Sequence, residues 1–125
     1  MLPTEQRLRK NRDFRTIYAK GRSHVHSLAV LYVLRRTGDG VALAPGRRVG
    51  FVVSKKQGDA VVRNRIKRRL REAVRERLPD LREGPYDVTF VGRGRLKTAS
   101  WPEVQSAVDE LLRRAGLLRS GQRSE

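Results

Sequence analysis

This 125-residue sequence lacks several features that would reveal a protein's chemistry or location. Cysteine is absent, which excludes disulfide bonds and thiolate metal sites. No apolar run approaches the roughly 18 residues that a membrane span requires. The first residues, MLPTEQRLRKNRDF, lack the apolar core of a secretory signal. We therefore expect a cytoplasmic protein that does not enter a membrane.

Acidic residues are scarce beside basic ones. The chain has 13 Asp and Glu against 29 Lys and Arg, so its formal net charge is +16. Such an excess opposes compaction by self-repulsion unless a polyanion neutralises it. Nucleic acid is the leading partner on this ground, and an anionic membrane surface is the second candidate. The few acids are scattered, whereas a two-metal nuclease needs convergent carboxylates, so we predict no catalytic residue in the protein.

The hydrophobic pattern predicts one α+β domain in the order αβββαβα, with helices packed on a small sheet. We expect this domain to cover residues 1–116 and a basic, disordered tail to follow at 117–125. Two β-rich runs should form a hairpin whose long tip is the Gly- and Pro-rich segment 37–46. The expected helices are 12–20, 60–78 and 100–116, and the expected strands are 27–36, 47–56 and 86–93, with an edge strand at 22–26.

Positive charge is densest at residues 60–79, AVVRNRIKRRLREAVRERLP. On a helical wheel, one side is apolar and is formed by Val62, Ile66, Leu70, Ala73 and Val74. The opposite side holds Asn64, Lys67, Arg68, Arg71 and Arg75, while Arg65 and Arg63 lie on the two flanks. The run has eight cations in all: Arg63, Arg65, Lys67, Arg68, Arg69, Arg71, Arg75 and Arg77.

Two interpretations of this helix compete. Most charged helices are simply solvated faces with i,i+4 ion pairs, but Glu72 and Glu76 cannot neutralise eight cations. We favour a polyphosphate-binding face, because each guanidinium group offers a rigid donor fork to phosphate oxygens. Both DNA and RNA fit this description. The preceding stretch VSKKQGDA favours RNA weakly, because it predicts a bent corner more than a straight rod for a DNA groove.

Some aromatic and histidine residues have two possible roles. Phe14 and Tyr18 lie one helical turn apart, so core packing and base stacking both fit them, and the same holds for Tyr32. Trp101 lies in the first turn of the last expected helix, where a packing role is favoured. His24 and His26 would share one face of a strand, but two ligands do not make a metal site, and we predict none.

The stretch GDAVVRNRIKRRLRE resembles the RNR signature of the bacterial ribonuclease P protein family. RLRKNRDFRTIYAKG and VGFVVSKKQG are similar to that family's N-terminal pattern and to its strand before the RNR helix. The resemblance covers roughly residues 5–95. It implies a sandwich similar to domain 2 of ribosomal protein S5, with a left-handed βαβ crossover that base rates alone would not predict.

The resemblance also implies a function. The family forms the protein subunit of ribonuclease P, in which a catalytic RNA with its Mg²⁺ ions removes the 5′ leader of precursor tRNA, and we expect one protein per RNA. The implied contacts to the catalytic RNA are Arg63, Asn64, Arg65, Lys67, Arg68 and Arg71. The implied contacts to the leader are Phe14, Tyr18, Tyr32, Lys56 and Arg15.

Two rival functions share the charge and the size of this chain. One is a non-catalytic RNA-binding module such as a ribosomal protein, and the other is a DNA-binding regulator. The chain also departs from the family pattern at Asp59, where Asn is frequent, and at Tyr18, where Phe is also common. An acid near phosphate is less favourable than an amide, so Asp59 leaves the details of the contacts open.

Overall fold

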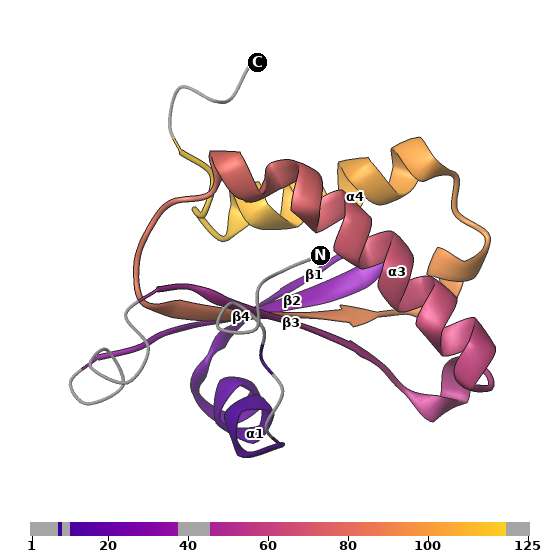
Figure 1. The fold of residues 1–125 in the computed structure, drawn as a ribbon, viewed down its shortest axis with the longest axis horizontal. Helices are drawn as coiled ribbons and strands as arrows, with labels where there is room; N and C mark the ends of the chain where they lie inside the picture. Colours follow the sequence, from indigo (N-terminus) through magenta and orange to yellow (C-terminus); the bar gives the residue numbers. More distant parts are fainter. Residues whose placement is uncertain (1–7, 9–10, 38–45, 120–125) are drawn as a thin grey trace.

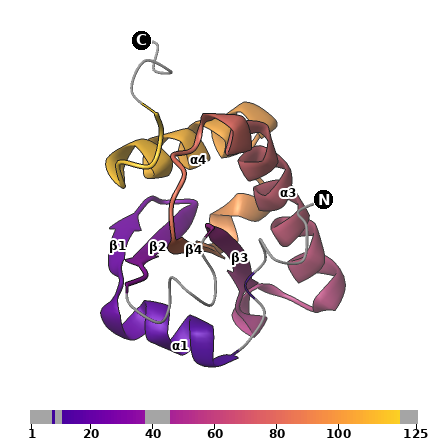
Figure 2. The ribbon, with the colours of Figure 1, turned by 60° about the vertical axis from the view of Figure 1, so that its left-hand side comes forward.

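The computed structural model describes residues 8, 11–37 and 46–119, which form a four-stranded sheet with helices on both faces (Figures 1 and 2). Helix α1 covers one face, and helices α3 and α4 cover the other. The element order confirms the predicted αβββαβα arrangement. The helices are α1 (Asn11–Lys20), α3 (Ala60–Arg77) and α4 (Trp101–Arg114), and the strands are β1 (Arg22–Val25), β2 (Ala29–Arg35), β3 (Arg48–Val53) and β4 (Tyr86–Gly92).

The strand order in the sheet is β1-β2-β4-β3. β1 pairs with β2 and β2 with β4 in antiparallel fashion, whereas β3 pairs with β4 in parallel. The predicted hairpin between residues 27–36 and 47–56 is therefore wrong, because β4 lies between these strands. Almost every residue of β4 is buried, which fits a central strand whose sheet is covered on both faces. β3, α3 and β4 form a parallel βαβ unit, and its left-handedness stays a prediction.

The sheet register determines which residues face each layer, since neighbouring residues of a strand point to opposite faces. Leu31 of β2, Phe90 of β4 and Phe51 of β3 stand side by side and face α3 and α4. Phe51 and Phe90 stack with a centroid distance of 5.9 Å. The predicted apolar side of α3 is confirmed, because Ile66, Leu70, Ala73 and Val74 are buried against this face, and Val62 is partly buried there.

Two of the helices begin at side-chain caps. The Asp59 side chain accepts a hydrogen bond from the Val62 amide at 3.0 Å and caps α3. At α4, Ser100 and Glu103 form a capping box, in which each side chain accepts a hydrogen bond from the other's backbone amide. Trp101 in the same turn packs partly buried against the core, as expected. These caps fix where α3 and α4 begin, and both helices cover the same face of the sheet.

The expected boundary of the domain at residue 116 is three residues short of the packed structure. Gly116 does end α4, with a φ of +72°. Leu117, however, is fully buried, and its carbonyl accepts a hydrogen bond from the Arg82 amide at 2.8 Å. Arg119 in turn donates its amide to Asp80 at 2.9 Å. A helix stop signal therefore did not mark the end of the core, and residues 120–125 of the expected tail lie outside the described part.

Turns of 3-10 helix connect the sheet to the long helices. η2 (Lys55–Gln57) links β3 to α3, η3 (Leu78–Asp80) follows α3, and η4 (Gly94–Lys97) links β4 to α4. The described part of the chain contains no helix long and apolar enough to pass through a bilayer.

Candidate nucleic-acid interface

The outward side of α3 presents cations that the protein itself does not bind. Asn64, Arg65 and Arg68 are exposed, and Arg63, Lys67 and Arg71 are half-buried. We call these six residues the α3 face. Within the described ranges, the side chains of Arg63, Arg65, Lys67 and Arg68 form no hydrogen bond or ion pair with protein groups. Arg71 lies over the Phe51 ring at 5.7 Å. The exposed N–H donors of the α3 face are therefore not occupied by groups of the described chain, whereas Arg63 Nε is buried without a partner.

The other three cations of α3 are bound by other groups of the protein. Arg69 donates to the carbonyls of Leu96 at 2.7 Å and Ala99 at 2.6 Å, which fixes η4 and the start of α4. Arg77 binds Asp109 and Asp80, with 2.9 Å between Arg77 Nη1 and Asp80 Oδ2.

Arg75, which the helical wheel placed on the outward side, pairs with Glu72 at 3.1 Å. Arg77 falls among the apolar positions of the same wheel and Arg69 lies at their edge, but Arg63 lies there too, so the wheel alone did not distinguish the two bound arginines from Arg63.

Acidic side chains in the described residues are all held by donors of the protein. Asp87 is the most deeply buried, at 3% exposure, and binds Arg48 and Arg36. In the described part, no three His, Asp or Glu side chains lie close enough to hold a metal ion. His26 Nδ1 accepts from the Leu28 amide in the β1–β2 turn. The held carboxylates are those of Asp13, Asp59, Glu72, Glu76, Asp80, Glu83, Asp87, Glu103, Asp109 and Glu110.

Aromatic residues meet on the opposite side of the sheet, beneath α1. Tyr18 of α1 is 41% exposed, and its ring meets the Tyr32 ring of β2 edge to face at 4.9 Å. Phe14 is half-buried and lies against Gly50 of β3. Ile17, between them in the sequence, is fully buried. Two of the three predicted aromatics are thus in contact, and the core of the α1 layer is formed by Ile17, not by Tyr18.

The Tyr18 hydroxyl, on the α1 side of the sheet, has a shifted pKa. Burial raises the pKa of Tyr18 above its ordinary value of 10, and the nearby Tyr32 hydroxyl raises it further. The Tyr18 hydroxyl therefore remains neutral at physiological pH. A neutral phenol can donate a hydrogen bond and does not repel a phosphate, which suits a surface that receives a polyanion.

Next to α1, the same face of the sheet has an apolar floor. The register places Val30 of β2, Val91 of β4 and Val52 of β3 in one row across the three strands, and each is only half-buried. Val25 of β1 continues the row and is 55% exposed. We call Phe14, Tyr18, Val30, Tyr32, Val52 and Val91 the α1 face.

A pocket of about 720 Å³ opens where this floor meets the ends of β3 and β4. Its cations, Arg93, Arg95 and Lys97, were not among the predicted site residues, although VGRGRLK places them directly after a strand. Lys97 donates to the Gln57 carbonyl at 3.0 Å and so joins η4 to η2. The remaining lining residues are Ser27, Ser54, Gln57, Val91, Gly92 and Gly94.

The last two predicted contacts, Lys56 and Arg15, are both exposed. Lys56 lies in η2, between the end of β3 and the start of α3, and Arg15 lies on α1. Neither has a side-chain partner within the described part of the chain. Their contact with a bound strand stays a prediction.

Comparison with known proteins gives consistent matches. A family model described as Ribonuclease P matches residues 2–116. The chain is 41% identical over 112 residues to the ribonuclease P protein component of Clostridium novyi (strain NT), covering 90% of this chain and 95% of that protein. It is 42% identical over 113 residues to the corresponding protein of Symbiobacterium thermophilum, covering 90% and 93%.

Two solved structures have the same fold. The Staphylococcus aureus RNase P protein superposes with a TM-score of 0.77 at 30% identity, covering 91% of this chain and 98% of that one. The Thermotoga maritima RNase P protein superposes with a TM-score of 0.72 at 28% identity, covering 86% and 96%.

Proposed function

This chain belongs to the ribonuclease P protein family, and from that premise we propose that it is the protein subunit of a ribonuclease P that matures the 5′ end of tRNA. Its partner is a catalytic RNA, which binds to the α3 face. The observation that supports this proposal is the set of cations on α3 that no carboxylate of the described chain neutralises. Because guanidinium forks match phosphate oxygens, such a set favours a polyphosphate partner.

The α1 face is the proposed site for the 5′ leader of precursor tRNA. A single strand presents unpaired bases, which stack on exposed rings such as Tyr18, and its riboses can lie on the valine floor. Stacking does not depend on base identity, so one enzyme can accept the leaders of many precursors. Arg15 and Lys56, together with the cations of the pocket, then bind leader phosphates.

We place the chemistry of cleavage in the RNA subunit. The carboxylates of the described residues do not fit a Mg²⁺ site, because each is held by protein donors and no three of them converge. We therefore assign Mg²⁺ to the RNA and assign no step of bond cleavage to a protein side chain. The protein acts as a monomer in a 1:1 complex, in which it binds substrate and RNA on its two faces.

Reconstitution tests this proposal directly. The purified protein is added to a bacterial ribonuclease P RNA and a precursor tRNA at a Mg²⁺ concentration too low for the RNA alone, and we expect leader cleavage to appear. A ribosomal protein of similar size and charge is the matched control, because it supplies the same non-specific neutralisation. Equal cleavage with both proteins, or none with this one, would contradict the proposal and favour a plain RNA-binding module or a DNA-binding regulator.

A further inference from the structure

The first half of β3 contacts the N-terminal part of the chain at three consecutive residues. Arg48 forms an ion pair with Asp13 of α1. The Val49 carbonyl accepts a hydrogen bond from the Leu8 amide at 2.9 Å. Gly50 lies under Phe14, so closely that a Cβ atom there would be 2.7 Å from Phe14 Cε1. Arg48 and Gly50 are two apart in the strand and point to the same face, so both hold α1 from below.

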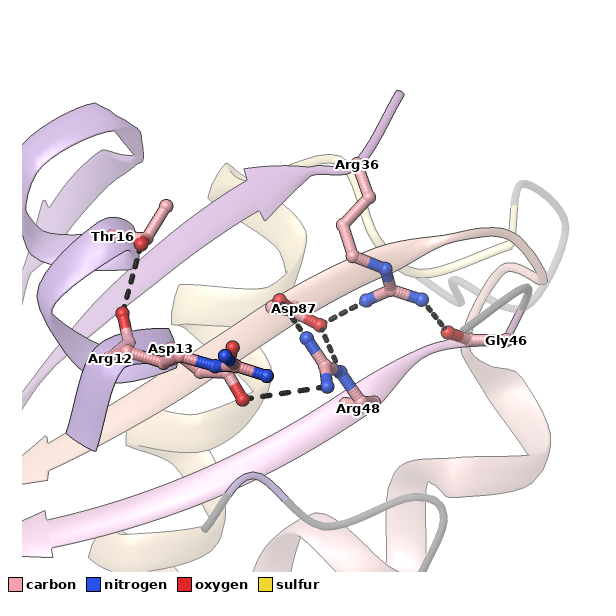
Figure 3. A network of polar contacts seen from close by, with 7 residues as sticks. All are labelled: Arg12, Asp13, Thr16, Arg36, Gly46, Arg48 and Asp87. Carbon is pink, nitrogen blue, oxygen red and sulfur yellow. Dashed lines mark hydrogen bonds and ion pairs between the residues drawn. The ribbon is translucent and has the colours of Figure 1, made fainter. Parts of the chain in front are cut away.

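Arg48 is itself fixed in orientation by a buried carboxylate (Figure 3). Its Nε and Nη2 atoms donate to the two oxygens of Asp87, each at 2.9 Å, and Asp87 also binds Arg36. This bidentate contact leaves Arg48 Nη1 directed at Asp13 Oδ2, at 3.6 Å. The Asp87 contact raises the pKa of Arg48, so the guanidinium stays charged. Asp13 is the only acid of α1, in its first turn, where a helix favours negative charge.

Helix α1 depends on such contacts because it is short. It has ten residues, fewer than the about 12–15 that an isolated helix needs for even marginal stability. Ile17 is its one buried residue, and its outer side carries Arg12, Arg15 and Lys20, which repel one another. With so little buried surface, the placement of Phe14 and Tyr18 over the sheet depends on a few directed contacts.

We propose that Asp13 and Arg48 are positioning residues for leader binding. Their ion pair, together with the Gly50–Phe14 contact, sets the distance between α1 and the sheet. That distance determines how far the rings of α1 lie from the valines and Tyr32 of the α1 face. This inference rests on the proposed function. Neither residue needs to touch the leader, since both act through the aromatic side chains of α1. Asp13 directly precedes Phe14 and lies five residues before Tyr18, so a shift of the first turn moves both rings.

Removal of the Asp13 charge changes leader affinity in opposite directions under a positioning role and under a purely electrostatic role. A carboxylate near a polyanion repels it, so loss of the Asp13 charge alone should strengthen leader binding. A positioning role predicts weaker leader binding, because α1 without its ion pair holds its rings at a different distance from the sheet. An Asp13→Asn substitution keeps the size of the side chain and tests this sign directly. Arg48 is a poorer target, because its loss would leave Asp87 with one fewer partner in a buried site.

The experiment measures the affinity of the reconstituted holoenzyme for precursor and mature tRNA. For Asp13→Asn we expect a loss of about three- to tenfold for the precursor and no change for mature tRNA, since only the precursor has a leader to stack. Glu83→Gln is the matched control, because it removes the same charge from a side chain that is 78% exposed and lies on another loop. Unchanged or tighter precursor binding by Asp13→Asn would overturn the inference.

A second background distinguishes positioning from a general loss of stability. In a holoenzyme with both Phe14→Ala and Tyr18→Ala, Asp13→Asn should cause no further loss of precursor affinity, because both rings through which it acts are gone. Additive losses would show that Asp13 acts by another route and would overturn the proposal. If wild-type holoenzyme does not prefer precursor over mature tRNA, the proposed leader site itself fails, which is a separate result.

Discussion

The two faces of this small domain are built from different residues and are suited to different recognition problems. The α3 face is built on an 18-residue helix whose buried stripe anchors it, and it offers charge without aromatic rings. The α1 face is built on a ten-residue helix and a bare stretch of sheet, and it offers rings and valines. A folded RNA presents a fixed array of phosphates, which suits rigid charge. A variable single strand presents bases of any sequence, which suits stacking.

The largest expected effect removes both faces together. Asp87→Ala would leave Arg36 and Arg48 without their buried carboxylate, and loss of one partner from a buried ion pair costs about 3–5 kcal/mol. We expect urea titrations to give a free energy of unfolding that is lower by this amount, with a lower midpoint. Binding to both RNAs should weaken as the fraction of folded protein falls. A midpoint within error of wild type would show that the network does not hold β2, β3 and β4 together.

Next in size is loss of the α3 face. Replacing Arg65 and Arg68 with Ala should weaken binding to the catalytic RNA for every substrate and lower the slope of log affinity against log salt by about 2, roughly one per lost phosphate contact. Arg113→Ala on α4 is the control, because that side chain is exposed on another helix. An unchanged salt slope in the double variant would place the RNA elsewhere.

Loss of one ring on the α1 face should affect the precursor alone. Tyr18→Ala should reduce precursor affinity by about 1–3 kcal/mol, the worth of one stacked base, and leave docking to the catalytic RNA intact. Tyr18→Phe keeps the ring and should bind nearly as wild type, in equilibrium titrations with labelled precursor and mature tRNA. If Tyr18→Ala weakened both tRNAs equally, the two faces would not be functionally separate.

The smallest effect concerns a helix end that belongs to neither face. The backbone amide of Ser100 lowers the pKa of Glu103 from its ordinary 4.5. A pKa lowered in the folded state adds stability that is present above about pH 4.5 and is lost as pH falls through the folded value. For Glu103→Gln, the melting temperature should therefore fall less steeply as the pH is lowered below about 4.5 than it does for the wild type. The preference for precursor over mature tRNA should stay at the wild-type value. A change in that preference would show that α4 influences the α1 face.

Much of this arrangement was predictable from local signals. The capping residues Asp59 and Ser100, the apolar stripe of α3 and the pair Phe14 and Tyr18 are short-range patterns, and a helix expresses such patterns wherever it folds. The pairing of strands was not predictable in the same way. A loop of Gly and Pro shows that the chain turns between β2 and β3, but it does not show that β4, more than thirty residues later, inserts between them.

The sequence by itself determined the charge, the helices and the identity of the residues that we propose to contact RNA, because these depend on composition and on spacing within a few residues. Only the tertiary structure decided which arginines are available to an external ligand. Arg69 donates its hydrogen bonds to a carbonyl, and Arg77 to a carboxylate, about 30 residues away in the sequence. It also decided that Asp13 meets Arg48 and that Phe14 meets Gly50. Contacts between distant segments depend on how the sheet is assembled, and no local pattern encodes that assembly.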